Sequence, residues 1–280
     1  MTLPSIELRP GADLQAAVSL LQGLATNCVS AAQPVGVTSP TAKQIAYVQW
    51  ASETEGRLRT ILSTRDAAAF FEGPRHRDIS SMTPGTQLLP MISMEVDAHA
   101  VRLNALADEL GLALRLFDGA GTCLILDTSF YIEHPEKIGE VDFHALAERA
   151  GPVRVLIPII VIDELDGLKK SRDCRWRAGY SLAVIDKVIT NPPWPGILSP
   201  ATHLPESPRG EVTFQIIFDS PGHVRLPIND DEIVDRALAC KPFTDDLTII
   251  TYDTGQSQRA RAAGVNVVKL QQDFGKEPGT

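Results

Sequence analysis

The sequence predicts an α/β fold, with a parallel sheet flanked by helices, preceded by an all-helical N-terminal domain. Apolar residues recur at a helical period as far as Leu110, and after Gly121 short apolar segments alternate with helical patterns. A chain of 280 residues is long for one compact domain. We therefore expect two domains, residues 1–118 and residues 119–280.

Three amphipathic helices are expected in the N-terminal domain, over residues 14–24, 41–62 and 89–110. The third carries the clearest one-sided apolar stripe. Gly111 and the pair Gly119 and Gly121 are expected to interrupt the helical pattern, and the domain boundary is placed near them.

The C-terminal domain is expected to alternate strands with helices. The expected strands are residues 123–126, 153–157, 212–218, 247–251 and 265–268. The expected helices are residues 159–168, 177–189, 231–240 and 256–263, with a further helix-like stretch around Phe143. Residues 191–227 are rich in Pro, Ser and Gly, which favours an elaborated loop around the third strand.

Composition limits the classes of function. With 35 acidic and 26 basic residues the net charge is -9, which argues against a protein that coats nucleic acid by bulk charge. The four cysteines are scattered and form no C-x-x-C pair, which favours reduced thiols in a cytoplasm. Residues 1–14 lack the pattern of a signal peptide, and the longest apolar run, residues 155–162, is too short to span a membrane. A soluble, cytoplasmic protein is expected.

Carboxylates follow several of the expected strands. Asp127 directly follows the first strand, and Asp253 lies two residues after residue 251. Asp230 and Asp231 lie at the start of a helix, and Glu164 lies in the helix after the second strand. Because ligands of parallel sheets bind beyond the carboxyl ends of the strands, we expect these side chains at one edge of the sheet.

Such a cluster predicts a site for Mg²⁺ or Mn²⁺. Crowded carboxylates repel one another, and their hard oxygen atoms suit these ions, which also bind phosphate oxygens in phosphodiester hydrolysis. For any one of these aspartates the alternative is a helix cap or a turn residue.

The motifs around these carboxylates resemble those of the PIN-domain family over roughly residues 122–270. They are Leu126-Asp127-Thr128-Ser129-Phe130, Val161-Ile162-Asp163-Glu164-Leu165-Asp166-Gly167-Leu168, Asn229-Asp230-Asp231-Glu232-Ile233 and Thr251-Tyr252-Asp253. Arg177-Ala178-Gly179 is similar to an element of the branch that includes the nonsense-mediated-decay endonuclease.

The resemblance implies a metal-dependent endoribonuclease that hydrolyses phosphodiester bonds of single-stranded RNA. It implies that Asp127, Glu164, Asp253 and a third-motif aspartate are the catalytic metal ligands. The spacing to Ile233 favours Asp230 as that aspartate, and Asp231 stays a candidate ligand.

The densest basic stretch lies between the second motif and Tyr180. It consists of Lys169, Lys170, Arg172, Arg175 and Arg177, with Trp176 among them. We expect a flexible loop beside the metal site that binds RNA phosphates, with Trp176 stacking on a base. The alternative is a solvated loop with Trp176 in the core.

Other functions fit the sequence less well. A phosphatase of the haloacid-dehalogenase type needs a second aspartate where Ser129 stands, and a receiver domain needs a lysine after the last strand. A dinucleotide-binding site needs glycines after the first strand, whereas Gly119 and Gly121 precede it. The remaining alternative is a non-catalytic RNA-binding or scaffold protein on a PIN fold. The helical domain could mediate self-association, bind a regulatory protein or cover the site.

Overall fold

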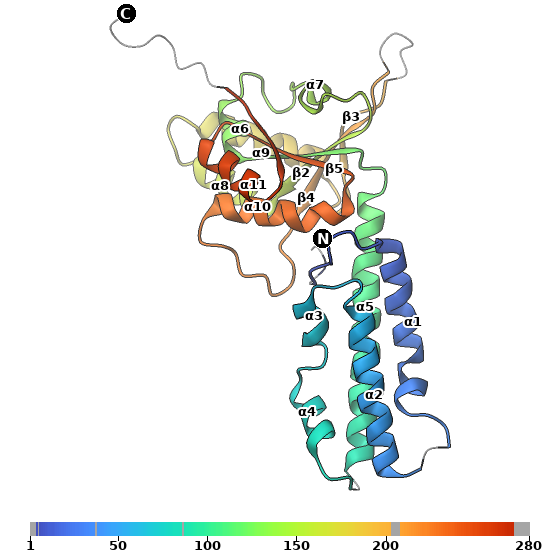
Figure 1. Ribbon diagram of the computed structural model, residues 1–280. Coiled ribbons are helices and arrows are strands. Elements are labelled where there is room, and N and C mark those ends of the chain that lie inside the picture. Colours follow the sequence, from blue (N-terminus) through green and yellow to red (C-terminus); the bar gives the residue numbers. More distant parts are fainter. Residues whose placement is uncertain (1–3, 5, 37, 86, 203–207, 272–280) are drawn as a thin grey trace, which may run out of the picture. The chain divides into compact units, whose positions relative to one another are not determined.

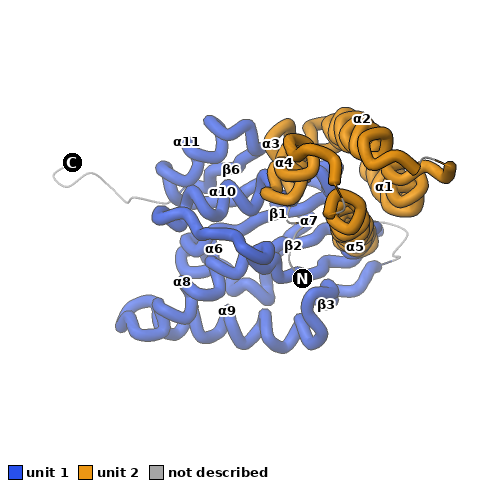
Figure 2. The backbone as a smooth tube through the Cα atoms, turned by 90° about the horizontal axis from the view of Figure 1, so that it is seen from below, with its two compact units in different colours: residues 1–3, 116–280 blue, residues 4–115 orange. Residues whose placement is uncertain are grey.

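The structure is a computed structural model that describes residues 4, 6–36, 38–85, 87–202 and 208–271. Residues 1–3 of the N-terminal segment and residues 203–207 of the expected loop lie outside this description. The chain divides between Arg115 and Leu116 into two compact units, which Figure 2 shows in different colours. This division lies three residues before the expected boundary, and independent folding of the two units stays a prediction.

The N-terminal unit is helical (Figure 1). Its helices are α1 (Leu14–Ala32), α2 (Pro40–Leu58), α3 (Thr64–Ala69), α4 (Pro74–Ser81) and α5 (Leu88–Phe117). The three long helices were predicted, whereas the short helices α3 and α4 were not. The interruption expected at Gly111 is wrong, because α5 continues through it. Buried Leu110 and Ala113 extend the apolar stripe across this glycine, and their packing outweighs a helix cost of about 1 kcal/mol.

The C-terminal unit is built on a six-stranded sheet with the order β3-β4-β2-β1-β5-β6. The strands are β1 (Thr122–Leu126), β2 (Val153–Pro158), β3 (Gly196–Ser199), β4 (Val212–Ile217), β5 (Asp246–Thr251) and β6 (Asn266–Lys269). All neighbouring pairs are parallel except β3 with β4. Together with the helical N-terminal region, this mostly parallel sheet confirms the predicted fold class.

Helices connect the strands of this sheet. They are α6 (Thr128–Glu133), α7 (Phe143–Ala147), α8 (Ile159–Leu168), α9 (Arg175–Val188), α10 (Asn229–Cys240) and α11 (Thr254–Ala262), with a 3₁₀ turn at Lys241–Phe243. Connections from β1 through β2 to β4 run one way across the sheet, and those from β4 through β5 to β6 run the other. Right-handed crossovers therefore place α6–α9 on one face and α10 and α11 on the other. Figure 2 shows α8 beside α9 and α10 beside α11.

This reversal of direction creates a switch point between β1 and β5. The two strands are paired in parallel from Thr122 to Leu126, opposite Asp246 to Ile250. The chain leaves β1 toward one face of the sheet and leaves β5 toward the other. In open parallel sheets, the crevice at the carboxyl ends of two such strands is the usual ligand site.

The central strands are buried, as their apolar runs predict. Every residue of β2 is buried, including Arg154. The Arg154 guanidinium donates to the carbonyl of Leu116 and, at 3.4 Å, to that of Asp118, and its Nε donates to Thr213 Oγ1 at 3.2 Å. A charged side chain can lie in this strand because backbone and side-chain oxygens satisfy its donors.

Candidate functional site

Asp127 and Asp253 lie at the carboxyl ends of the neighbouring strands β1 and β5. The hydroxyl of Thr251, which is fully buried, donates to Asp127 Oδ2 and accepts the backbone N–H of Asp253 at 2.8 Å. The backbone N–H of Asp127 also donates to the carbonyl of Ile250 at 3.2 Å. The structure therefore brings these two predicted site residues together.

The Asp127 side chain accepts several hydrogen bonds and is almost completely buried. Its side chain accepts the N–H of Phe130 at 3.0 Å and the Ser129 hydroxyl at 2.7 Å, so that it also caps α6. Only 4% of Asp127 is exposed. This burial raises the pKa of Asp127 to about 6, against the opposing effect of its hydrogen bonds, and the charge of Asp253 raises it further. A buried carboxylate of this kind is stabilised by a nearby cation.

Glu164 joins this edge from α8. Its Oε2 accepts the hydroxyl of Thr128, which directly follows Asp127, and its Oε1 accepts the Asn229 side-chain amide at 2.6 Å. Asn229 is the first residue of α10. Glu164 is therefore connected both to the first motif and to the helix that carries Asp230. The sequence drew attention to Asp230 and Asp231 and gave no role to Asn229.

Asp230 lies among other carboxylates. Its pKa is raised, first by burial and then by the charge of Asp253, while Arg259 lowers it and Glu164 and Asp231 add smaller upward contributions. A Cβ atom built on Gly255 would lie 3.0 Å from Asp253 Oδ1 and 3.9 Å from Asp230 Oδ2. The absence of a side chain at Gly255 therefore leaves space for both carboxylates.

Arg259 of α11 distinguishes the two aspartates of the third motif. It donates to Asp231 Oδ1 at 2.8 Å, whereas its Nε lies 3.7 Å from Asp230 Oδ2. Asp231 is thus paired with the Arg259 guanidinium, and Asp230 makes a longer and weaker contact with the same group. The ion pair of Arg259 with Asp231 depends on tertiary structure that no spacing rule in the sequence predicts.

The carboxylates fit a hard divalent cation by their chemistry. Three segments besides β1 contribute carboxylates to the same edge, and burial and mutual repulsion raise the pKa values of Asp127 and Asp230. Their spacing is wider than that of a compact ligand set. Among the described residues, the three-residue group with all ligand atoms within 4.8 Å of one another is Asp219, His223 and Glu232.

That second group is a salt-bridge network between the end of β4 and α10. His223 Nε2 lies 2.8 Å from Oε1 of the fully buried Glu232, and Arg236 Nη2 lies 3.1 Å from His223 Nδ1. Arg225 donates to Asp219 Oδ2 at 2.7 Å. Two guanidinium groups already balance the charge of these carboxylates, which makes the group a poor cation site. We interpret these contacts as structural, because they hold residues 219–226 against α10.

The basic stretch is only partly a loop. The expectation of one flexible loop is wrong for Arg175 and Arg177, which lie in the first turn of α9, the helix that was expected from residue 177. Arg177 donates to the carbonyls of His134, Pro135 and Glu136, so its guanidinium joins α9 to the segment after α6.

The other cations of the stretch are exposed. Lys169 pairs with Asp166 at 2.5 Å. No side-chain partner within the described ranges is found for the remaining three, Lys170, Arg172 and Arg175. The alternative that buries Trp176 is wrong, since 61% of that residue is exposed.

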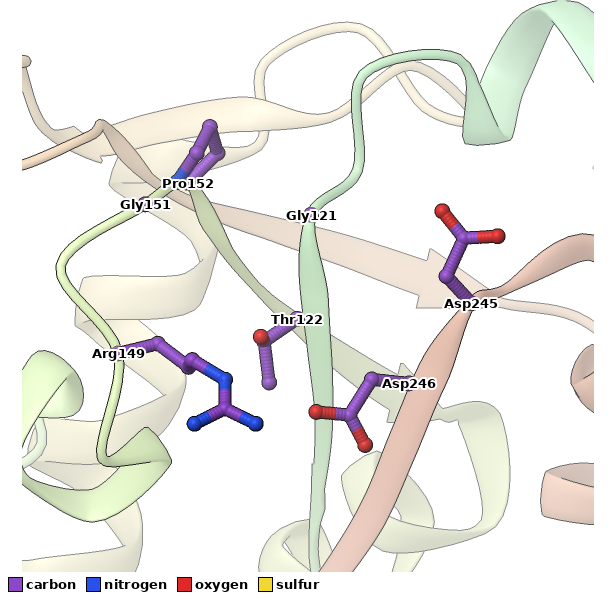
Figure 3. A pocket seen from close by; sticks show the side chains of 7 residues that line it. All are labelled: Gly121, Thr122, Arg149, Gly151, Pro152, Asp245 and Asp246. Carbon is purple, nitrogen blue, oxygen red and sulfur yellow. The ribbon is translucent and has the colours of Figure 1, made fainter.

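A cavity of about 480 Å³ lies at the opposite, amino-terminal edge of the sheet. Figure 3 shows Arg149 and Asp246 on either side of Thr122, the first residue of β1. The predicted carboxylates follow the other ends of these strands. The cavity is therefore separate from the candidate site.

Comparison with known proteins identifies one family. The sequence matches the family described as PIN domain over residues 124–271. A solved structure described as a domain of a functionally unknown protein from Methanocaldococcus jannaschii DSM 2661 is 14% identical, covering 57% of this chain and 99% of its own, with a TM-score of 0.35. None of the curated proteins matches. Within the described residues, no helix is long and apolar enough to cross a membrane.

Proposed function

The chain belongs to the PIN-domain family, whose members are generally nucleases, and on this premise we propose that it is a metal-dependent endoribonuclease. The proposal is supported by the electrostatic interactions between carboxylates of four segments near the switch point between β1 and β5. Asp253, Glu164 and Asp231 all act electrostatically on Asp230. A phosphodiester is the substrate class that such a site would serve best, because cations held there would neutralise phosphate oxygens.

We assign Asp127, Glu164, Asp230 and Asp253 as the residues that would hold Mg²⁺ or Mn²⁺. Asp230 is preferred over Asp231 because Arg259 donates to Asp231 at the shorter distance. Bound cations would supply positive charge to the substrate phosphate and increase the acidity of a water molecule.

The protein's own contribution is to orient these carboxylates. Thr251 fixes Asp127 relative to the backbone of Asp253, and Thr128 and Asn229 fix the two oxygens of Glu164. Each of these hydroxyl and amide donors holds one carboxylate oxygen in place. The remaining carboxylate lone pairs stay available for a cation.

The proposal extends to the substrate and the subfamily. Exposed Lys170, Arg172 and Arg175 supply the local positive charge that an acidic chain needs in order to bind RNA. Arg177 supports substrate binding indirectly, because it fixes the start of α9.

We also propose that the chain is related to the PIN-domain branch that includes the nonsense-mediated-decay endonuclease, and that the protein is cytoplasmic. Self-association or regulator binding through the helical unit is likewise proposed.

Cleavage of labelled single-stranded RNA tests the catalytic assignment. Wild-type protein should cleave with Mg²⁺ or Mn²⁺ and not with EDTA, and Asp127→Asn should be inactive because it loses a ligand charge. Asp186→Asn, at an exposed position on α9, is the matched control and should remain active. RNA binding without cleavage in either metal would instead favour a non-catalytic RNA-binding protein on the same fold.

Salt-dependent RNA binding tests the substrate surface. Replacing Lys170, Arg172 and Arg175 with Ala should weaken binding and lower the salt slope by roughly 0.7 for each phosphate that the variant no longer binds. Lys187→Ala, at the far end of α9, should leave both quantities unchanged. Wild-type affinity and slope in the triple variant would remove these residues from the substrate surface.

A further inference from the structure

Trp176 and Tyr180 form a stacked pair on the first turns of α9. Their ring centroids lie 5.6 Å apart and their planes differ by 16°. Trp176 is nevertheless 61% exposed. Tyr180 thus covers one face of the indole, and most of the remaining surface of Trp176 is open to solvent.

The pair is held in a fixed position. The Tyr180 hydroxyl lies close to Gly139, where a Cβ atom would approach it to 3.1 Å. Lys137 Nζ lies 5.8 Å from the centre of the Tyr180 ring. Arg177 joins the same turn of α9 to the segment after α6 through three backbone carbonyls. The indole is therefore presented by a supported helix and not by a free loop.

The segment around Trp176 carries mostly basic side chains, with one exposed acidic residue, Asp173, and little other exposed apolar surface. Lys170, Arg172 and Arg175 are exposed close to it in sequence. Among the residues that the structure describes, no other large apolar side chain of α8 or α9 is exposed. A protein interface needs a contiguous apolar centre depleted in charge. A single exposed aromatic ring in a mostly basic segment instead matches the chemistry of single-stranded nucleic acid, with bases that stack and phosphates that pair with Lys and Arg.

We propose that Trp176, supported by Tyr180, is a stacking site for one unpaired base of the substrate strand, whose phosphates contact Lys170, Arg172 and Arg175. This inference rests on the proposed function and narrows its substrate to strands with accessible bases. The site is connected to the carboxylates through the chain itself, because the segment fixed by Arg177 follows α6, and α6 begins after Asp127. Stacking would hold the strand in a defined register.

Fluorescence titration in EDTA tests the stacking site without cleavage. Single-stranded RNA should quench the emission of the exposed Trp176, whereas Trp50 is buried in the helical unit. Trp176→Ala should lower affinity roughly 5- to 150-fold, the range for loss of one stacked base. Trp176→Phe should restore most of the affinity, because it keeps an aromatic face. Trp194→Ala, at another exposed tryptophan, is the matched control and should bind as wild type does.

Ligand variants separate base stacking from phosphate binding. An abasic oligonucleotide should bind wild type as weakly as the normal oligonucleotide binds Trp176→Ala. Single-stranded DNA should lose the same factor as RNA on Trp176→Ala, because every base has an aromatic face. Duplex binding should not depend on Trp176.

Several results would overturn the stacking site. They are wild-type affinity in a folded Trp176→Ala variant, equal binding of abasic and normal strands, and no RNA binding by the wild-type protein. The two proposals can fail separately. Trp176-dependent binding without cleavage in Mg²⁺ or Mn²⁺ would refute only the catalysis, and cleavage with unchanged binding by Trp176→Ala would refute only the stacking site.

Discussion

Asp127→Asn is expected to stabilise the protein in EDTA while it abolishes cleavage. The pKa of Asp127 is raised by burial from 3.8 to about 6. A folded-state pKa above the unfolded value means that this carboxyl favours folding when protonated. Its contribution is fully present below pH 3.8 and is lost as the pH rises through about 6. A shift of this size corresponds to about 3 kcal/mol of lost stability above pH 6.

The substitution removes that charge but also changes a hydrogen bond. Asn at this position can still accept from Phe130 and Ser129 through its oxygen. In the wild type the Thr251 hydroxyl donates to Asp127 Oδ2. In the variant the Asn amide would face this hydroxyl, which could no longer donate to that position. The loss of that bond should cost about 1 kcal/mol. The expected net gain near pH 7.5 is therefore about 2 kcal/mol, equivalent to roughly 4–8 °C in the melting temperature.

Calorimetry of the full chain in EDTA measures this difference for the transition of the C-terminal unit. Near pH 4 the gain should disappear, because the wild-type carboxyl is then largely neutral and, like the Asn amide, no longer offers the Thr251 hydroxyl a charged acceptor. Added Mn²⁺ should stabilise the wild type more than the variant, since only the native ligand set is complete. Asp186→Asn should show none of these differences. A variant less stable than wild type at pH 7.5 in EDTA, or a difference independent of pH, would refute the electrostatic reasoning.

Two further expectations concern the architecture. Gly121→Ala should destabilise the C-terminal unit by at least about 3 kcal/mol, because φ is +64° and the new Cβ would lie 2.1 Å from the carbonyl oxygen of Pro152. Gly119→Ala has φ +63° but nothing within 4 Å, and should cost only about 1–2 kcal/mol in chemical denaturation. A fragment that begins at Arg115 should fold and retain metal-dependent cleavage, whereas one that begins at Thr128 lacks β1 and should not fold. Equal losses of stability in the two glycine variants, or an Arg115 fragment without a cooperative transition, would contradict these expectations.

The parts of the fold that the sequence predicted are those with strong periodic or continuous apolar patterns. The helix α8 was predicted at its observed bounds, Ile159–Leu168, and all five expected strands were found to within one residue at each end. The edge strand β3 was missed because its side chains alternate between half-buried and exposed and its pairing is irregular. The short helices α3, α4 and α6 were missed because six to eight residues give little periodicity.

The positions of the proposed site residues were predictable to the level of strand end, whereas their contacts were not. Asp127 and Asp253 follow from their positions after strands, because the carboxyl ends of parallel strands share one edge. The pairing of Asp231 with Arg259 and the support of Glu164 by Asn229 depend on how α8, α10 and α11 approach that edge. Side-chain contacts between such distant segments are set by packing, and no local pattern encodes them.

The buried hydroxyl of Thr251 has a consequence for how the site is assembled. It joins the carboxylate at the end of β1 to the backbone at the end of β5, and these two strands are hydrogen-bonded neighbours within the sheet. The conformational entropy of bringing Asp127 and Asp253 together is therefore lost when the chain folds. The binding of a cation would not lose this entropy a second time. The two carboxylates should therefore keep their relative positions when a chelator removes the cation and when the cation binds again. The positions of Glu164 and Asp230 depend instead on how α8 and α10 pack against this edge of the sheet.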